Sequence, residues 1–145
     1  MKHASCAACF VAAATLGAGL GCGGSGQLDS EESDALSAMK TESLPYFFLG
    51  NSFHGLPLTH VEHAQRSASL IYGDCTPTGG EQPSCVPPLE IQNTVCDSKT
   101  VNVTIFTDGK HPGFDTEAAD ELRAVNRAAR DARPMVTFDQ SLLCD

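Results

Sequence analysis

Alternating apolar and polar positions predict a series of short β-strands through the middle of the chain. The first is an aromatic, β-prone run at residues 45–49, which Gly50 and Asn51 end in a turn. Residues 53–61 alternate less regularly around Pro57, a pattern typical of an edge strand or an extended loop. Apolar residues fall on alternate positions in three cleaner strands, at residues 67–72, 89–95 and 101–105.

A helical pattern follows these strands, from Asp115 or Thr116 to about residue 132. Acidic side chains near its start and basic ones near its end match the helix dipole, and Pro134 ends the helix. Its apolar stripe recurs at helical spacing and consists of Ala118, Leu122, Val125, Ala129 and Ala132.

Val136 and Phe138 fit one more strand near the end of the chain. The short link at residues 96–100 predicts that the two strands on either side of it pair antiparallel. These elements predict an α+β fold, in which one C-terminal amphipathic helix packs on one face of a small, mostly antiparallel sheet.

The N-terminus has the layout of a secretory signal peptide. Lys2 and His3 give a short basic start, and the apolar run at residues 10–20 is too short and too rich in glycine to span a bilayer. The segment from Gly19 to Cys22 resembles the lipobox of bacterial lipoproteins, which predicts acylation of Cys22, and a Gly/Ser run follows. The alternative is ordinary signal-peptidase cleavage with Cys22 left free or paired.

We therefore expect a signal peptide at residues 1–21, a lipid-anchored flexible tether at residues 22–43 and one disulfide-stabilised domain at residues 44–145. Residues 27–43 of the tether are polar and acidic and include few large apolar residues. They predict a spacer, in which residues 30–39 could form a transient helix.

The net charge is −9 over 145 residues, with 18 acidic and 9 basic side chains. Nucleic acid is excluded as an expected partner, because such binding depends on neutralising phosphates with an excess of Lys and Arg. An anionic membrane would repel such a domain, so we expect membrane association through acyl chains on Cys22 alone.

Four cysteines of the expected domain, Cys75, Cys85, Cys96 and Cys144, allow three disulfide connectivities. Proximity and the turn-rich sequence between Cys75 and Cys85 favour pairing those two, which leaves Cys96 to pair with Cys144. Free buried thiols are the alternative, and an oxidising location disfavours them.

His54, His60 and His63 lie within ten positions and form a candidate zinc or copper site. Residues three apart in an extended strand point to opposite faces, so this site requires a helical turn at His60 and His63. Exposed or hydrogen-bonded histidines are the alternative interpretation.

Arg123, Arg127 and Arg130 stand at helical spacing and form a candidate anion-contact row on an otherwise acidic chain. A solvated helix face, partly neutralised by Asp120 and Asp131, is the simpler alternative.

The chain contains no recognisable nucleophile elbow, phosphate-binding loop or dinucleotide fingerprint, so we assign no catalytic residue and no cofactor. The sequence predicts an exported binding or structural module whose partner is a surface protein or another envelope ligand. The alternative is a small extracytoplasmic metal-dependent hydrolase that uses His54, His60 and His63.

Several short motifs occur in a fixed order along about half of the chain: residues 46–50, the Gly-Leu-Pro-Leu run at 55–58, Tyr-Gly-Asp-Cys at 72–75 and Pro-Pro-Leu-Glu at 87–90. In this order they resemble small secreted or lipid-anchored proteins of high-GC Gram-positive bacteria. The resemblance implies a bacterial, exported protein in which Cys75 and Cys85 flank a variable turn. It implies no activity, ligand or catalytic residue.

Overall fold

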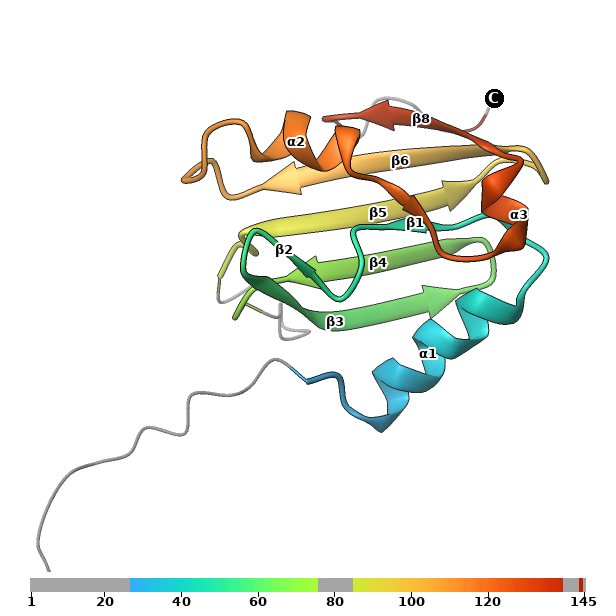
Figure 1. Cartoon of the computed structure of the whole chain (residues 1–145), viewed down its shortest axis with the longest axis horizontal. Helices are drawn as coiled ribbons and strands as arrows, with labels where there is room; N and C mark the ends of the chain where they lie inside the picture. The colour runs from blue at the N-terminus through green and yellow to red at the C-terminus, as the bar shows by residue number, and fades with distance from the viewer. Residues whose placement is uncertain (1–26, 76–84, 140–143, 145) are drawn as a thin grey trace, which may run out of the picture.

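A curled six-stranded sheet in the order β2-β3-β4-β5-β6-β8 forms the centre of the protein (Figure 1). The computed structural model describes residues 27–75, 85–139 and 144. All neighbouring strands are antiparallel except β6 and β8, which are parallel, so the expected α+β class with a mostly antiparallel sheet is confirmed. The strands are β2 (Ser52–Phe53), β3 (Leu56–Ala64), β4 (Ser67–Tyr72), β5 (Leu89–Val95), β6 (Thr100–Thr107) and β8 (Arg133–Thr137).

The hydrophobic core lies on one face of this sheet, where the alternating apolar positions of β4, β5 and β6 converge. Leu89 and Ile91 are fully buried, and Val95 faces Val101 across the antiparallel β5–β6 pair. Side chains between them, such as Gln92 and Thr94, stay half-buried or exposed on the opposite face. The strands predicted at residues 67–72, 89–95 and 101–105 are confirmed, and so is the antiparallel pairing across the 96–100 link.

A bulge explains the irregular alternation in β3. The register with β4 shifts between Leu58 and His60, so Leu58 and Val61 both reach the core although they are three positions apart. The Thr59 hydroxyl at the bulge donates to the carbonyl of Gly73, 2.5 Å away. β2 pairs only with the beginning of β3, so the rest of β3 behaves as the expected edge strand.

A second, two-stranded sheet lies over the core face and consists of β1 (Phe47–Phe48) and β7 (Arg123–Ala124). Buried side chains of the main sheet attach β1 to it. The Asn93 amide accepts from the N–H of Phe47 at 2.7 Å and donates to its carbonyl at 2.9 Å. The Tyr72 hydroxyl accepts from the N–H of Leu49 at 2.9 Å.

The expected helix at residues 115–132, packed as a unit on the sheet, is wrong. The segment divides into α2 (Phe114–Asp120), β7 and α3 (Arg127–Arg130). β7 pairs with β1, and the N–H of Val125 donates to the carbonyl of Tyr46 at 2.9 Å. Asn126 then caps α3 by accepting from the N–H of Ala129. Pairing with β1 therefore replaces helical hydrogen bonds in the middle of the apolar stripe.

The expected spacer is also wrong from residue 30 onward, because α1 (Ser30–Thr41) is a folded helix against the free edge of β3 (Figure 1). Asp29 and Glu32 form a reciprocal capping box at its start. Leu36 and Met39 are 6% and 0% exposed and join the core. Two well-placed apolar side chains and a strong N-cap suffice for a helix that also protects an edge strand.

The two tyrosines of the chain provide a test of this packing. Burial, reinforced by the nearby Glu42 carboxylate, raises the pKa of Tyr46 to about 12. Burial also raises the pKa of Tyr72 above its ordinary value of 10. The neutral phenols thus contribute stability below pH 10, and this contribution is lost as the pH rises through the folded-state pKa values.

We expect the native protein to show no tyrosinate absorbance at pH 10, where the urea-unfolded chain is about half ionised. A spectrophotometric titration of both states measures this directly, because the chain contains no tryptophan. Tyrosinate absorbance of the native protein at pH 10 equal to that of the unfolded chain would contradict the packing of both rings.

Candidate binding surface

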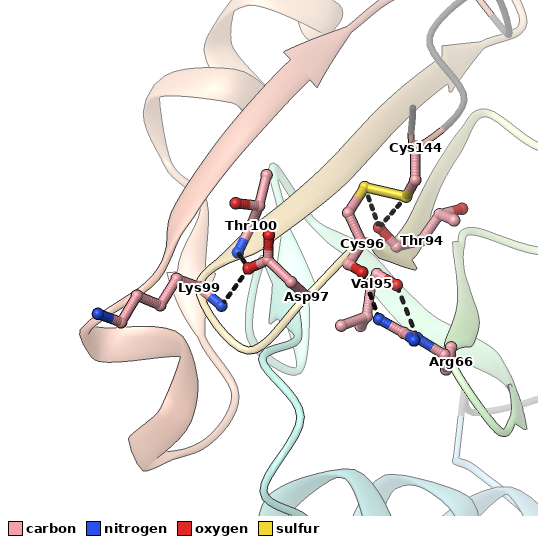
Figure 2. The surroundings of a disulfide bond; sticks show 8 residues. All are labelled: Arg66, Thr94, Val95, Cys96, Asp97, Lys99, Thr100 and Cys144. Carbon is pink, nitrogen blue, oxygen red and sulfur yellow. Dashed lines mark hydrogen bonds between the residues drawn. A yellow bond between two sulfur atoms is a disulfide. The ribbon is translucent and has the colours of Figure 1, made fainter.

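Two disulfides close the chain in the expected pairing, Cys75 with Cys85 and Cys96 with Cys144. Their Cα atoms are 6.0 Å and 5.1 Å apart, respectively. The second bond joins residue 144 to the turn between β5 and β6 (Figure 2). Both bonds fit an oxidising, extracytoplasmic environment. In the described residues no helix has the length and apolar character needed to cross a membrane.

The structure does not bring His54, His60 and His63 to one centre. β3 is extended at His60 and His63, which place their rings on opposite faces of the strand. Each of the three histidines has its own carboxylate partner, one in α2 and two at opposite ends of α1. The closest are Glu117 for His54 at 3.2 Å, Glu32 for His60 at 2.5 Å and Glu42 for His63 at 3.3 Å.

Hydrogen bonding to neighbours describes these histidines better than a shared metal ion. His60 links β3 to the first turn of α1 through Glu32. His63 lies 3.1 Å from the hydroxyl of Tyr46, and the two rings meet in a T-shaped, edge-to-face contact. Over residues 27–75, 85–139 and 144, no group of three or more His, Cys, Asp or Glu side chains is arranged to hold a metal. The described residues therefore do not form the three-histidine centre on which the metal-dependent hydrolase was expected to depend.

The arginine row is divided by the broken helix. Arg123 belongs to β7 and pairs with Phe48 of β1, so the expected row is wrong for this residue. Arg127 and Arg130 remain three positions apart on the single turn of α3, and both are exposed.

Arg127 and Arg130 are instead part of a larger group, which we call the basic end. It contains six of the nine Lys and Arg residues of the chain. All six are exposed and come from helix ends, turns and a strand start at one end of the sheet: Lys40, Arg66, Lys99, Arg127, Arg130 and Arg133 (Figure 1).

Asn126 connects the α1 and α3 parts of the basic end. Its buried amide nitrogen donates to the carbonyls of Met39 and Leu44, both at 2.7 Å, while its oxygen caps α3. The last turn of α1, which carries Lys40, is thereby held against the helix that carries Arg127 and Arg130.

The β3–β4 and β5–β6 turns supply the other part of the basic end. The Arg66 guanidinium donates to the carbonyls of Val95 and Cys96, which places the β3–β4 turn beside the disulfide (Figure 2). The N–H of Arg133 donates to the carbonyl of Lys99 at 2.8 Å, so the start of β8 adjoins the β5–β6 turn. The Lys99 side chain extends away from the disulfide (Figure 2).

Two carboxylates in the same segments, Asp97 and Glu42, are engaged by other groups. Asp97 accepts from the N–H groups of Lys99 and Thr100 at 2.7 Å and 2.8 Å, and these bonds hold the pKa of its carboxyl below the ordinary value. Glu42 meets His63 and the Tyr46 hydroxyl. Among the residues that the structure describes, none of the six cations forms an ion pair within 4.0 Å.

Sequence reasoning missed Lys40, Arg66, Lys99 and Arg133, although part of the signal was present. Arg66 and Lys99 follow predicted strands that run in the same direction, so their turns lie at the same end of an antiparallel sheet. The sequence held no comparable indication for Lys40 and Arg133. A spacer was expected in place of α1, and one continuous helix was expected in place of α2, β7 and α3.

A shallow hollow on the face opposite the core adjoins the basic end. Its volume is about 220 Å³, and hydroxyl and amide side chains line it, including Ser67, Ser69, Gln92 and Thr94. Glu90 accepts hydrogen bonds from both Ser69 and Gln92 at 2.7 Å, which orders this part of the surface.

No protein-family model matches the chain, and no curated protein or solved structure is significantly similar to it.

Proposed function

We propose that the protein is an exported, lipid-anchored module of the cell surface that binds an anionic partner through the basic end. The observation that carries this proposal is the gathering of six exposed cations on a chain of net charge −9, where none of the six forms an ion pair within 4.0 Å with a described residue. Dispersed cations on such a chain would be neutralised by the excess of acidic groups. Gathered cations instead produce a local positive potential, which attracts anions.

The anchor in this proposal is Cys22, which lies outside the described residues together with the expected signal peptide at residues 1–21. The lipobox-like segment before Cys22 and the Gly/Ser run after it support acylation. The two disulfides support export, and so does the resemblance to secreted or lipid-anchored bacterial proteins. A tether also raises the effective concentration of a weak binder near the envelope.

Cys22→Ser tests both parts of the proposal in the producing cells. We expect the variant to move from the membrane pellet to the soluble fraction, because one or more acyl chains would be lost. We then expect the purified variant to bind isolated cell envelopes when it is added back. Arg127→Gln with Arg130→Gln should lower the bound fraction severalfold, since exposed charge contacts contribute up to about 1 kcal/mol each.

Lys110→Gln with Arg123→Gln is the matched control, because it removes the same charge away from the basic end. Membrane association that survives Cys22→Ser, with no acyl mass on the wild-type N-terminal peptide, would contradict the anchor. Equal envelope binding by the two double variants would contradict the role of the basic end.

A further inference from the structure

We infer that the partner of the basic end is a linear polyanion of the cell envelope, a polymer that carries phosphate or carboxylate groups at intervals. This inference rests on the proposed function and names the chemistry of its partner. Three observations lead to it: the exposure of the cations, their distribution over separate segments and the position of the tether.

The basic end is spread out over several segments of the fold. Its six side chains come from the end of α1, two turns, α3 and the start of β8, and every one is exposed. The hollows on the open face of the sheet and beside α1 are lined by other residues. A small anion would meet only one or two solvated cations, whose contacts are weak in water.

A flexible chain of anions can reach several of these cations at once. Arg127 and Arg130 lie on one helical turn, so their side chains are neighbours. Arg133 follows shortly after them and is joined through its backbone to Lys99. Once one anionic group of a polymer is bound, the next binds at high effective concentration, so weak contacts add up. Guanidinium groups suit phosphate and carboxylate oxygens in particular.

The position of the tether favours a polymer over the membrane. The expected anchor enters the fold at the start of α1, beside the acidic Glu31 and Glu32, whereas Lys40 lies in its last turn. The 12 residues of α1 span about 18 Å, so its acidic first turn and Lys40 lie at opposite ends of the helix. In the orientation in which the first turn of α1 faces the membrane, Lys40 faces outward.

Binding of the full chain carrying Cys22→Ser to long-chain linear polyphosphate tests the inference. Tripolyphosphate at equal total phosphate and phosphatidylcholine vesicles with and without phosphatidylglycerol are the comparison ligands. We expect at least about tenfold tighter binding per phosphate to the long chain than to tripolyphosphate, because only the long chain spans the separate segments. If about five cations contact the polymer, the salt dependence per contact of flexible polyanions applies to each of them. The affinity should then fall about 100-fold between 50 and 200 mM salt.

Arg127→Gln with Arg130→Gln should weaken polyphosphate binding about tenfold. It should also reduce the slope of log affinity against log salt concentration by about 1.4. Lys110→Gln with Arg123→Gln should change neither the affinity nor this slope. Circular dichroism of both double variants verifies their folding. Equal affinity per phosphate for tripolyphosphate and long-chain polyphosphate would overturn the inference that the partner is a polymer. Tight binding to anionic vesicles, without binding to polyphosphate, would overturn it as well. If no anion binds, the proposed function fails as well, so the two failures are distinguishable.

Discussion

Loss of the Cys96–Cys144 disulfide is expected to lower the free energy of unfolding by about 4 kcal/mol. The bond joins residues 48 positions apart, so it removes much of the conformational freedom of the unfolded chain. The loop that it closes contains all of β6, α2, α3 and β8. β8 pairs with β6 in parallel after a long crossover, a pairing that is costly in loop entropy without a covalent link.

Urea denaturation of Cys96→Ser with Cys144→Ser, compared with the wild type in oxidising buffer, measures this effect. Cys75→Ser with Cys85→Ser is the control for loop length, because that bond spans only 10 positions and is expected to contribute about 3 kcal/mol. A Cys96/Cys144 variant with the urea midpoint of the wild type would contradict the prediction. Peptide mapping without reductant should recover both observed pairs.

Replacing Asn93 by leucine is expected to lower the free energy of unfolding by about 3 kcal/mol, although the side chain keeps its approximate size. Asn93 is 1% exposed, and its amide takes the place of a neighbouring strand for Phe47. Leucine leaves the N–H and the carbonyl of Phe47 without these partners inside the core. A buried backbone group that loses its partner costs roughly 1–3 kcal/mol.

Asn93→Leu and Asn93→Ala together separate the hydrogen bonds from the cavity, because only alanine also leaves a void. Gln92→Leu is the matched control on the adjacent position, where the side chain is half-buried and faces away from the core. We expect the control to stay within about 1 kcal/mol of the wild type. An Asn93→Leu variant as stable as the control would show that β1 does not depend on this amide.

The pattern of the sequence was enough to predict the strands at the centre of the sheet, and it favoured the observed disulfide pairing among the three possible ones. In β5, apolar residues at Leu89, Ile91 and Val95 specify which face is buried, because successive side chains of a strand alternate between faces. Cys75 and Cys85 are only 10 positions apart, and the turn-rich sequence between them favoured their pairing. Both are local properties, so they needed no knowledge of the rest of the fold.

The elements around that centre depend on contacts between segments that are distant in the sequence. The apolar stripe at residues 118–132 has helical spacing. The backbone at Arg123 and Ala124 nevertheless pairs with β1, and a continuous helix could not have made this pairing. α1 became stable only because β3 offered it an edge and a core for Leu36 and Met39.

The basic end depended on tertiary structure in the same way, because Lys40 and Arg133 are 93 positions apart in the sequence. Asn126 and the β5–β6 turn bring their segments to one end of the sheet. Periodicity reports which face of a single element is buried. Which elements meet depends on hydrogen bonds and contacts between distant segments, and those contacts exist only once the chain has folded.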